Sequence, residues 1–191
     1  MAGMKNALQV ISRMVADRVV AAYAVTGAVA ALNYIEPTLT EDLDILISVE
    51  GLDDQPRSGL VTLAPVFAYL RNAGYADLRN EGIVIEGWPV QFLPVANDLD
   101  AEGLAEANEI EIESPNGGAP VRVRVLRAEH LVATALNVGR PKDLIRITQF
   151  LTEQAVDLSL LRAVLGRHKL RHAWSRFCAQ TGVRDPYAVD S

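Results

Sequence analysis

The order of hydrophobic and polar positions predicts helices and strands in alternation over the first two thirds of the chain. Helical spacing of hydrophobic residues predicts helices at residues 4–18, 28–34, 61–73 and 98–107. Short runs rich in β-branched residues, or hydrophobic at every second position, predict strands at 23–26, 42–49, 83–86, 90–95, 109–113 and 121–126. Pro37 lacks the amide hydrogen of a helix interior, so a loop is expected over 36–41.

The strand predicted at residues 42–49 has two different faces, because successive side chains on a strand point to opposite sides. One side carries Leu43, Ile45 and Ile47, and the other carries Asp42, Asp44 and Leu46. We expect the first side to lie in the hydrophobic core. The beginning of the second side is expected to be strongly acidic.

Turn signals separate the other elements. Gly74 follows the third predicted helix in a position that often closes a helix, and Gly87-Trp88-Pro89 separates two predicted strands. The last two strands are expected to form a hairpin, because Asn116-Gly117 is a strong turn signal. Residues 51–56, which include two aspartates, are expected to form an acidic loop.

After residue 126 the pattern becomes helical throughout. Four successive helices are predicted at residues 128–137, 142–153, 158–166 and 170–181. The chain is therefore expected to be an α+β protein, with an α+β core over 1–126 and a helical carboxy-terminal segment over 127–191 that packs on the core. The uncharged run at 19–35 is short for a membrane span and fits a strand followed by a helix, so no membrane partner is expected.

Composition narrows the possible functions only a little. The 191 residues are 50% hydrophobic and 22% charged, which is ordinary for a globular protein. A formal net charge of -6 argues against a protein that coats nucleic acid with a broad basic surface, but it leaves room for a local basic groove. The single cysteine, Cys178, excludes an internal disulfide, and without an evident secretory signal a reducing cytoplasm is the expected setting.

Asp42 and Asp44 carry the first candidate chemistry. Side chains two residues apart on a strand lie on one face, about 7 Å apart. Their oxygens suit Mg²⁺, which takes one or two carboxylates and completes its shell with water and substrate phosphates. An acidic strand end in contact with solvent fits the same spacing, so the spacing alone leaves both interpretations open.

A glycine turn, Val25-Thr26-Gly27, lies about a dozen residues before this strand and joins a predicted strand to a predicted helix. Glycine lets the backbone approach a ligand closely, and amides at a helix start favour an anion such as phosphate. A phosphate-binding turn beside a metal-binding strand would form one coherent site. The alternative is a glycine that only allows two elements to pack tightly.

These residues resemble a known family. Thr26-Gly27-Ala28, followed by Pro37-Thr38-Leu39-Thr40-Glu41-Asp42-Leu43-Asp44, is similar to the nucleotidyltransferase superfamily of DNA polymerase beta, and most like AbiEii-like toxins and related small bacterial proteins. The resemblance implies a nucleotidyltransferase-type mixed sheet flanked by helices. It also implies Mg²⁺-dependent transfer of a nucleotide from a nucleoside triphosphate such as ATP to an RNA or protein acceptor, in a toxin–antitoxin setting.

A second motif, Gly139-Arg140-Pro141-Lys142-Asp143-Leu144, resembles the Arg-x-Lys-Asp helix motif of the same family. The resemblance implies that Lys142 reaches the phosphates and that Asp143 supports the site. It assigns catalysis to Asp42, Asp44, Lys142 and Asp143, and nucleotide binding to Thr26, Gly27, Ala28, Thr40 and Arg140. Ordinary explanations stay open, namely a solvated lysine, an acid at a helix start and an arginine that closes a helix end.

The chain departs from the family pattern at three positions. Ala28 replaces a glycine or serine, Arg146 replaces an aspartate, and Gln91 takes the place of a third carboxylate. Glutamine is a poorer metal ligand than a carboxylate and cannot act as a general base, so Glu86 on the preceding strand is the candidate substitute. The expected metal ligands are Asp42, Asp44 and Glu86. The alternative function is a catalytically degenerate protein of this fold that binds or regulates a partner.

Residues 167–172 are rich in basic side chains, and His168 and His172 are spaced as on one helical face. The others are Arg167, Lys169 and Arg171. A basic patch that meets RNA and a solvated helix face both fit this pattern. No histidine stands at zinc-ligand spacing from a cysteine or an acidic residue, so zinc is not expected.

Overall fold

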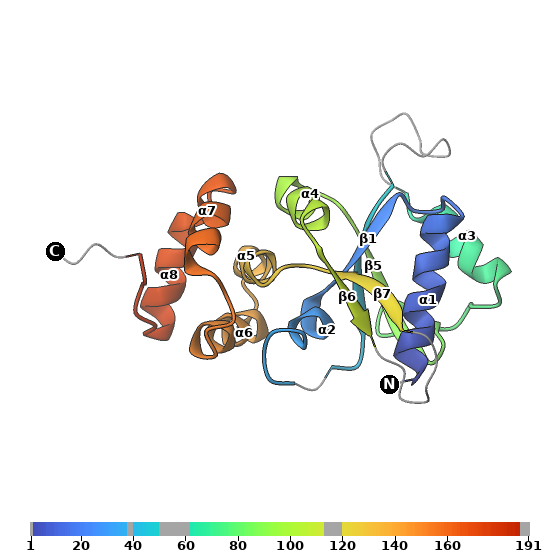
Figure 1. Cartoon of the computed structure of the whole chain (residues 1–191), viewed down its shortest axis with the longest axis horizontal. Coiled ribbons are helices and arrows are strands. Elements are labelled where there is room, and N and C mark those ends of the chain that lie inside the picture. Colours follow the sequence, from blue (N-terminus) through green and yellow to red (C-terminus); the bar gives the residue numbers. More distant parts are fainter. Residues whose placement is uncertain (1, 38–39, 50–61, 113–119, 188–191) are drawn as a thin grey trace. The chain divides into compact units, whose positions relative to one another are not determined.

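The computed structural model describes residues 2–37, 40–49, 62–112 and 120–187 (Figure 1). The described chain mixes α and β structure, as the sequence predicts, with helices flanking a seven-stranded mixed sheet. Its internal contacts divide it into two units, Met1–Ala30 with Thr38–Leu126 and Ala31–Pro37 with Arg127–Ser191, and each is described by itself. The predicted Asn116-Gly117 turn and the acidic loop at 51–56 lie outside the described residues.

The first unit is built on a mixed sheet whose described strands run in the order β3-β4-β5-β2-β1-β7-β6. The strands are β1 (Ala22–Thr26), β2 (Leu43–Ser48), β3 (Leu78–Arg79), β4 (Gly82–Ile85), β5 (Trp88–Pro94), β6 (Asn108–Ile112) and β7 (Val121–Val125). β1 is antiparallel to β2 and parallel to β7, while β2 is parallel to β5. Antiparallel pairing of β3 with β4, β4 with β5, and β6 with β7 completes the sheet on both sides of these central strands.

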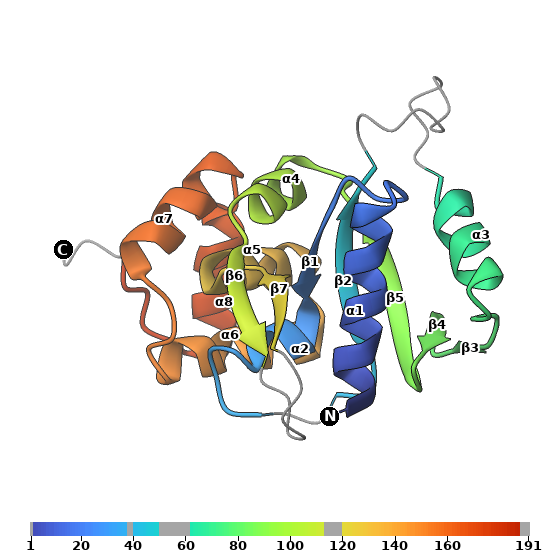
Figure 2. The ribbon, with the colours of Figure 1, turned by 45° about the vertical axis from the view of Figure 1, so that its right-hand side comes forward.

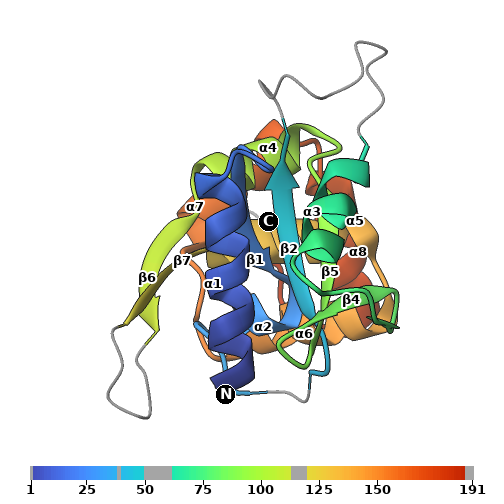
Figure 3. The same ribbon diagram turned by 90° about the vertical axis from the view of Figure 1, so that its right-hand side faces the viewer.

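Helices cover this sheet. They are α1 (Ala2–Ala16), α2 (Gly27–Ala31, whose last residue is assigned to the second unit), α3 (Ala64–Asn72) and α4 (Asp98–Ala105). α1 runs along one face of the sheet, next to β1 and β7 (Figure 2 and Figure 3). Its predicted hydrophobic stripe is confirmed, because Leu8, Ile11 and Met14 are all buried.

The predicted alternation in β2 is confirmed. Leu43, Ile45 and Ile47 are completely buried on one side of the strand. Leu46, on the other side, is also buried, so that side is polar only at its two ends, Asp44 and Ser48. β2 begins at Leu43, and Asp42 therefore precedes the strand instead of opening it.

Three elements differ from their predicted form. The β4–β5 turn consists of Glu86 and Gly87, both with positive φ, and β5 follows it directly instead of beginning after a longer turn. β3 has only two residues, both exposed, which is too short for a hydrophobic pattern to predict. α2 ends at Ala31, three residues before the predicted end, and a turn follows in which the amides of Tyr34 and Ile35 both donate to the Ala31 carbonyl.

The second unit is helical, and all four predicted helices are confirmed. They are α5 (Ala128–Val138), α6 (Pro141–Thr152), α7 (Leu158–Arg167) and α8 (Arg171–Thr181). Trp174, Phe150 and Phe177 are its largest fully buried side chains, and the rings of Trp174 and Phe177 lie 5.5 Å apart. No described helix of the chain is long and apolar enough to cross a membrane.

The expectation that His168 and His172 share one helical face is wrong. Lys169, between α7 and α8, has a positive φ of 59°, a conformation that a helix does not contain. The amide of Leu170 donates to the carbonyl of Leu165 at 2.8 Å, which closes α7. His168 therefore caps the end of one helix, while His172 lies in the first turn of the next.

Candidate functional site

Thr26, Asp44 and Gln91 form a row of polar residues across three adjacent central strands, here called the polar row. Thr26 is the register partner of Asp44 in the antiparallel β1–β2 pair. Asp44 is the register partner of Gln91 in the parallel β2–β5 pair. Register partners project from the same face of a sheet, so the three side chains share one face where β1 turns into α2.

Gly27 brings the backbone directly against the carboxylate of Asp44. Its φ of +65° lies in the left-handed region that favours glycine. A Cβ atom on Gly27 would clash with Oδ2 of Asp44 and lie 2.9 Å from its Cγ. Only glycine therefore fits here without a shift, and the glycine predicted as a close-approach residue does approach a functional group.

Asp42 is held by the loop that leads into β2. The hydroxyl of Thr40 donates to the carbonyl oxygen of Asp42 at 3.2 Å and to its Oδ1 at 3.4 Å. Thr40 therefore positions Asp42, a local role that does not depend on a phosphate. The two aspartates therefore have different neighbours, since Asp42 lies beside Thr40 and Asp44 lies beside Gly27.

Among the described residues, no third histidine, cysteine, aspartate or glutamate joins Asp42 or Asp44 in a set of metal ligands. Glu86 lies in the β4–β5 turn, where its Oε1 accepts a hydrogen bond from the Tyr75 hydroxyl at 2.6 Å. β5 separates β4 from β2, and the residue of β5 beside Asp44 is Gln91. We therefore leave Glu86 out of the metal set, because strand order and register put the amide of Gln91 in the place where a third carboxylate is needed.

Asp143 holds Arg140 at the beginning of α6, in the second unit. Its Oδ2 accepts hydrogen bonds from Nε of Arg140 at 2.7 Å and from the Arg140 amide at 3.2 Å, and its Oδ1 accepts from Nη2 at 3.2 Å. Nη1 of Arg146 lies 3.9 Å from the same Oδ1. Asp143 is 1% exposed, whereas the Arg140 side chain is 58% exposed, so the buried acid orients a cation that solvent can reach.

Lys142 is exposed in the first turn of α6. It and Arg140 belong to the second unit, whereas the polar row belongs to the first. Ala28, in the first turn of α2, is half-buried. The roles of Lys142 and Arg140 towards phosphate stay predictions from the resemblance.

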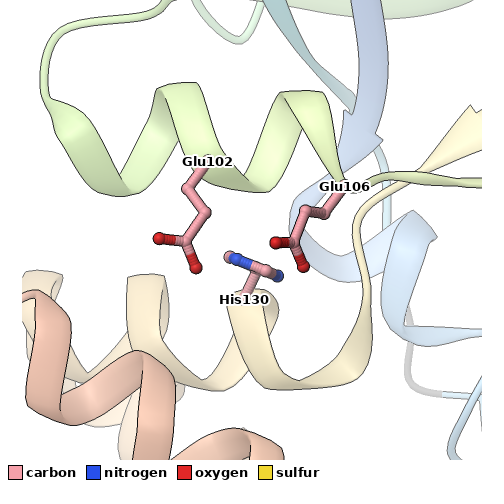
Figure 4. A group of neighbouring side chains, drawn as sticks. All are labelled: Glu102, Glu106 and His130. Atoms are coloured by element: carbon pink, nitrogen blue, oxygen red, sulfur yellow. The ribbon is translucent and has the colours of Figure 1, made fainter.

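Three further side chains carry metal-ligand atoms. Glu102 lies on α4, and Glu106, one turn later, caps the carboxyl end of that helix, with both carboxylates on the same side (Figure 4). His130 lies on α5 of the second unit. Carboxylate and imidazole are groups that metal ions accept as ligands. The sequence does not mark the two glutamates as possible ligands, since their four-residue spacing looks the same on any solvated helix face.

Cys178 is a buried thiol. Its side chain packs in the helical core, and burial, with the nearby carboxylate of Asp185, raises its pKa to about 11. Only the thiolate is a good nucleophile, so this cysteine is suited to packing and poorly suited to catalysis at neutral pH.

Comparison of the chain with protein-family models and with curated proteins finds no match.

Proposed function

We propose that the first unit binds a nucleoside triphosphate with Mg²⁺ at the polar row, and that the chain transfers a nucleotide from it to an RNA or protein acceptor. One observation carries the proposal, namely the carboxylate of Asp44 against the Gly27 backbone, beside Thr26 in the β1–β2 register. A magnesium–nucleotide complex needs anionic oxygens for the metal and a close backbone approach for the phosphates. Both features occur side by side at this turn.

The residues present fit one Mg²⁺ ion. Asp42 and Asp44 supply the one or two carboxylates that Mg²⁺ usually takes from a protein. Bound there, the ion would neutralise negative charge on the phosphates. Thr40 keeps Asp42 in place through its hydroxyl, and Gly27 leaves the Asp44 carboxylate the space that a side chain would fill.

The remaining roles follow the resemblance. Lys142 and Arg140 would balance phosphate charge, and Asp143 would act through Arg140, whose guanidinium it holds. Ala28 would contribute only its backbone, where the family has a glycine or a serine. ATP is the proposed nucleotide, and a toxin–antitoxin pair in the cytoplasm is the proposed setting.

A second candidate function is favoured by Gln91. Its position beside Asp44 leaves the polar row with an amide where a general base would stand, and an amide does not accept a proton at neutral pH. In this alternative the chain binds the magnesium nucleotide and regulates or recruits a partner without transferring anything.

The first experiment measures binding of ATP by calorimetry with and without Mg²⁺. Asp44→Asn should weaken Mg²⁺-dependent binding by about tenfold or more, because one of two charged ligands is lost. Asp98→Asn is the matched control, an exposed acid in the first turn of α4, and should leave binding unchanged. Equal affinities of wild type and Asp44→Asn would end the proposal.

The second experiment separates transfer from binding. Wild type and Gln91→Asp are incubated with each labelled nucleoside triphosphate, Mg²⁺, and either bulk RNA or cell extract, and label on macromolecules is counted. Transfer by the wild type supports the first candidate. Binding without transfer by the wild type, with transfer gained by Gln91→Asp, supports the second.

A further inference from the structure

The two units carry opposite formal charges. The first contains eight lysines and arginines against seventeen aspartates and glutamates, a formal charge of -9. The second contains ten against seven, a formal charge of +3. Within the second unit the imbalance is greatest between residues 158 and 187, with six basic residues and one acid, Asp185. The whole-chain charge of -6 hides this basic region.

A pocket of about 190 Å³ opens in this basic region, between α7, α8 and the segment that follows α8. Its lining includes Arg162, Arg171, Trp174, Ser175, Asp185 and Tyr187. Pockets for whole drug-sized ligands run from roughly 300 to 1,000 Å³. This pocket therefore suits a single charged group more than an entire nucleotide.

The walls of the pocket are fixed by hydrogen bonds. Oδ1 of Asp185 accepts from Nε1 of Trp174 and from the amide of Tyr187, both at 2.9 Å. The Tyr187 hydroxyl donates to the carbonyl of Leu158 at 2.8 Å. The polar groups of Trp174 and Tyr187 and one oxygen of Asp185 are therefore engaged in hydrogen bonds within the protein. The two arginines are the side chains of the pocket that we consider for ligand recognition.

Both arginines are placed by packing. The guanidinium of Arg162 lies over the Tyr187 ring, 5.6 Å from its centroid. The guanidinium of Arg171 lies against the backbone of Gly166, where a Cβ atom would be 2.9 Å from Nη2. Neither guanidinium forms a salt bridge with an acid among the described residues, and two guanidiniums outweigh the one carboxylate of the pocket.

We propose that this pocket binds a phosphate group of a nucleic-acid strand. Guanidinium forks match phosphate oxygens in geometry and charge. Beyond the pocket, Lys169 and Arg176 are exposed and can meet the neighbouring phosphates of the same strand. A concave pocket selects a protruding phosphate, whereas a membrane surface would need a flat basic face with apolar anchors. The site lies within the second unit and does not depend on nucleotidyl transfer at the polar row.

The test uses Trp174 as the reporter, because it lines the pocket and the chain has only one other tryptophan. In a Trp88→Phe background, fluorescence is titrated with inorganic phosphate and with a 12-nucleotide single-stranded RNA that carries a 5′-phosphate. We expect both probes to change the Trp174 signal, with the RNA binding at least about tenfold more tightly through its additional phosphates and more weakly as salt rises.

Two variants are compared in the same titrations. Arg171→Gln should weaken both probes by about tenfold, the cost of one charge-assisted fork. Arg176→Gln removes the same charge from the same helix but does not line the pocket. It should leave phosphate binding unchanged and weaken RNA binding by about two- to threefold.

Gly166→Ala tests whether the loss of affinity in Arg171→Gln could come from misfolding. Alanine suits the helix position, so circular dichroism should show an intact fold, while its methyl group displaces the Arg171 guanidinium. RNA affinity should fall although no charge has changed. Equal losses for Arg171→Gln and Arg176→Gln would overturn the proposal, as would the absence of any Trp174 response, or binding of anionic vesicles but not of RNA. Asp44→Asn should bind RNA normally, which separates this test from that of the polar row.

Discussion

Asp44 in the first unit and Asp143 in the second both lie beside a helix start, but their surroundings differ. Asp143 is almost fully buried and accepts three hydrogen bonds from Arg140. Asp44 is half-buried and lies against Gly27, and a side chain at position 27 would clash with its carboxylate. The more buried aspartate is thus explained by its contacts in the first turn of α6, while the less buried one lies where a ligand is proposed to bind.

The same contrast extends to charge. The acidic first unit contains the proposed metal site, and the basic second unit contains the proposed phosphate pocket. A single net charge describes neither, because it averages two regions of opposite sign. The comparison can be tested by three changes, in order of decreasing expected effect.

The largest expected effect is that of Gly27→Ala. A positive φ costs alanine about 1–2 kcal/mol, and the clash with the Asp44 carboxylate should bring the total loss of unfolding free energy to about 2–4 kcal/mol. Urea unfolding measures this loss. Gly74→Ala is the control, since Gly74 also has a positive φ but no atom near the place of a Cβ, and it should lose only the backbone contribution.

A double variant sharpens the same experiment. In an Asp44→Ala background, the cost of Gly27→Ala should fall towards that of Gly74→Ala, because the carboxylate is gone. If the cost of Gly27→Ala does not depend on residue 44, the close approach of this backbone to Asp44 is not what requires the glycine.

The next effect is that of Asp143→Asn. It removes the Asp143 carboxylate that contacts Arg140 and Arg146, and we expect a loss of about 1–3 kcal/mol, below that of a fully buried pair because the Arg140 side chain is mostly exposed. Asp98→Asn, the corresponding first-turn acid of α4, should cost less than about 1 kcal/mol. Similar losses for the two variants in urea unfolding would mean that Asp143 has no special structural role.

The smallest effect concerns pH and Cys178. A pKa of about 11, against an ordinary value of 9.0, means that the native state keeps the thiol protonated after the unfolded state has released the proton. The stabilisation is therefore complete below about pH 9 and is lost as pH rises through 11. At pH 8 the native thiolate fraction is about 100-fold lower than in the unfolded chain, so Ellman's reagent should react at least that much more slowly with native protein. Rapid labelling of native protein at pH 8 would contradict the burial of Cys178.

Hydrophobic spacing was sufficient to predict most helices and strands, because Leu8, Ile11 and Met14, for example, repeat with the period of the element that buries them. It failed where an element has no period of its own. The two-residue β3 is too short to show a hydrophobic period. The break between α7 and α8 depends on the positive φ of Lys169, and a lysine in the sequence does not predict a positive φ.

The candidate site was predicted in its parts. The sequence shows a glycine after one predicted strand and two aspartates at the start of the next. The contact between Gly27 and Asp44, however, depends on the antiparallel register of β1 and β2. Strand order is also the reason why Glu86 is not proposed as a metal ligand, since β5 lies between β4 and β2. Closeness along the chain does not show which residues of different strands are neighbours, because the pairing of all the strands in the sheet sets the register.

The sequence by itself determined which residues could carry chemistry and which elements hold them, because residue type and hydrophobic period are local properties. The tertiary structure decided which of these residues meet. It placed Asp44 against Gly27 and beside Gln91, and it enclosed Asp143 with Arg140. It also gathered Arg162 and Arg171 from two helices around one pocket. Apart from the local contact of Asp143 with Arg140 at the start of α6, these contacts join residues from different elements, and packing and strand pairing fix them.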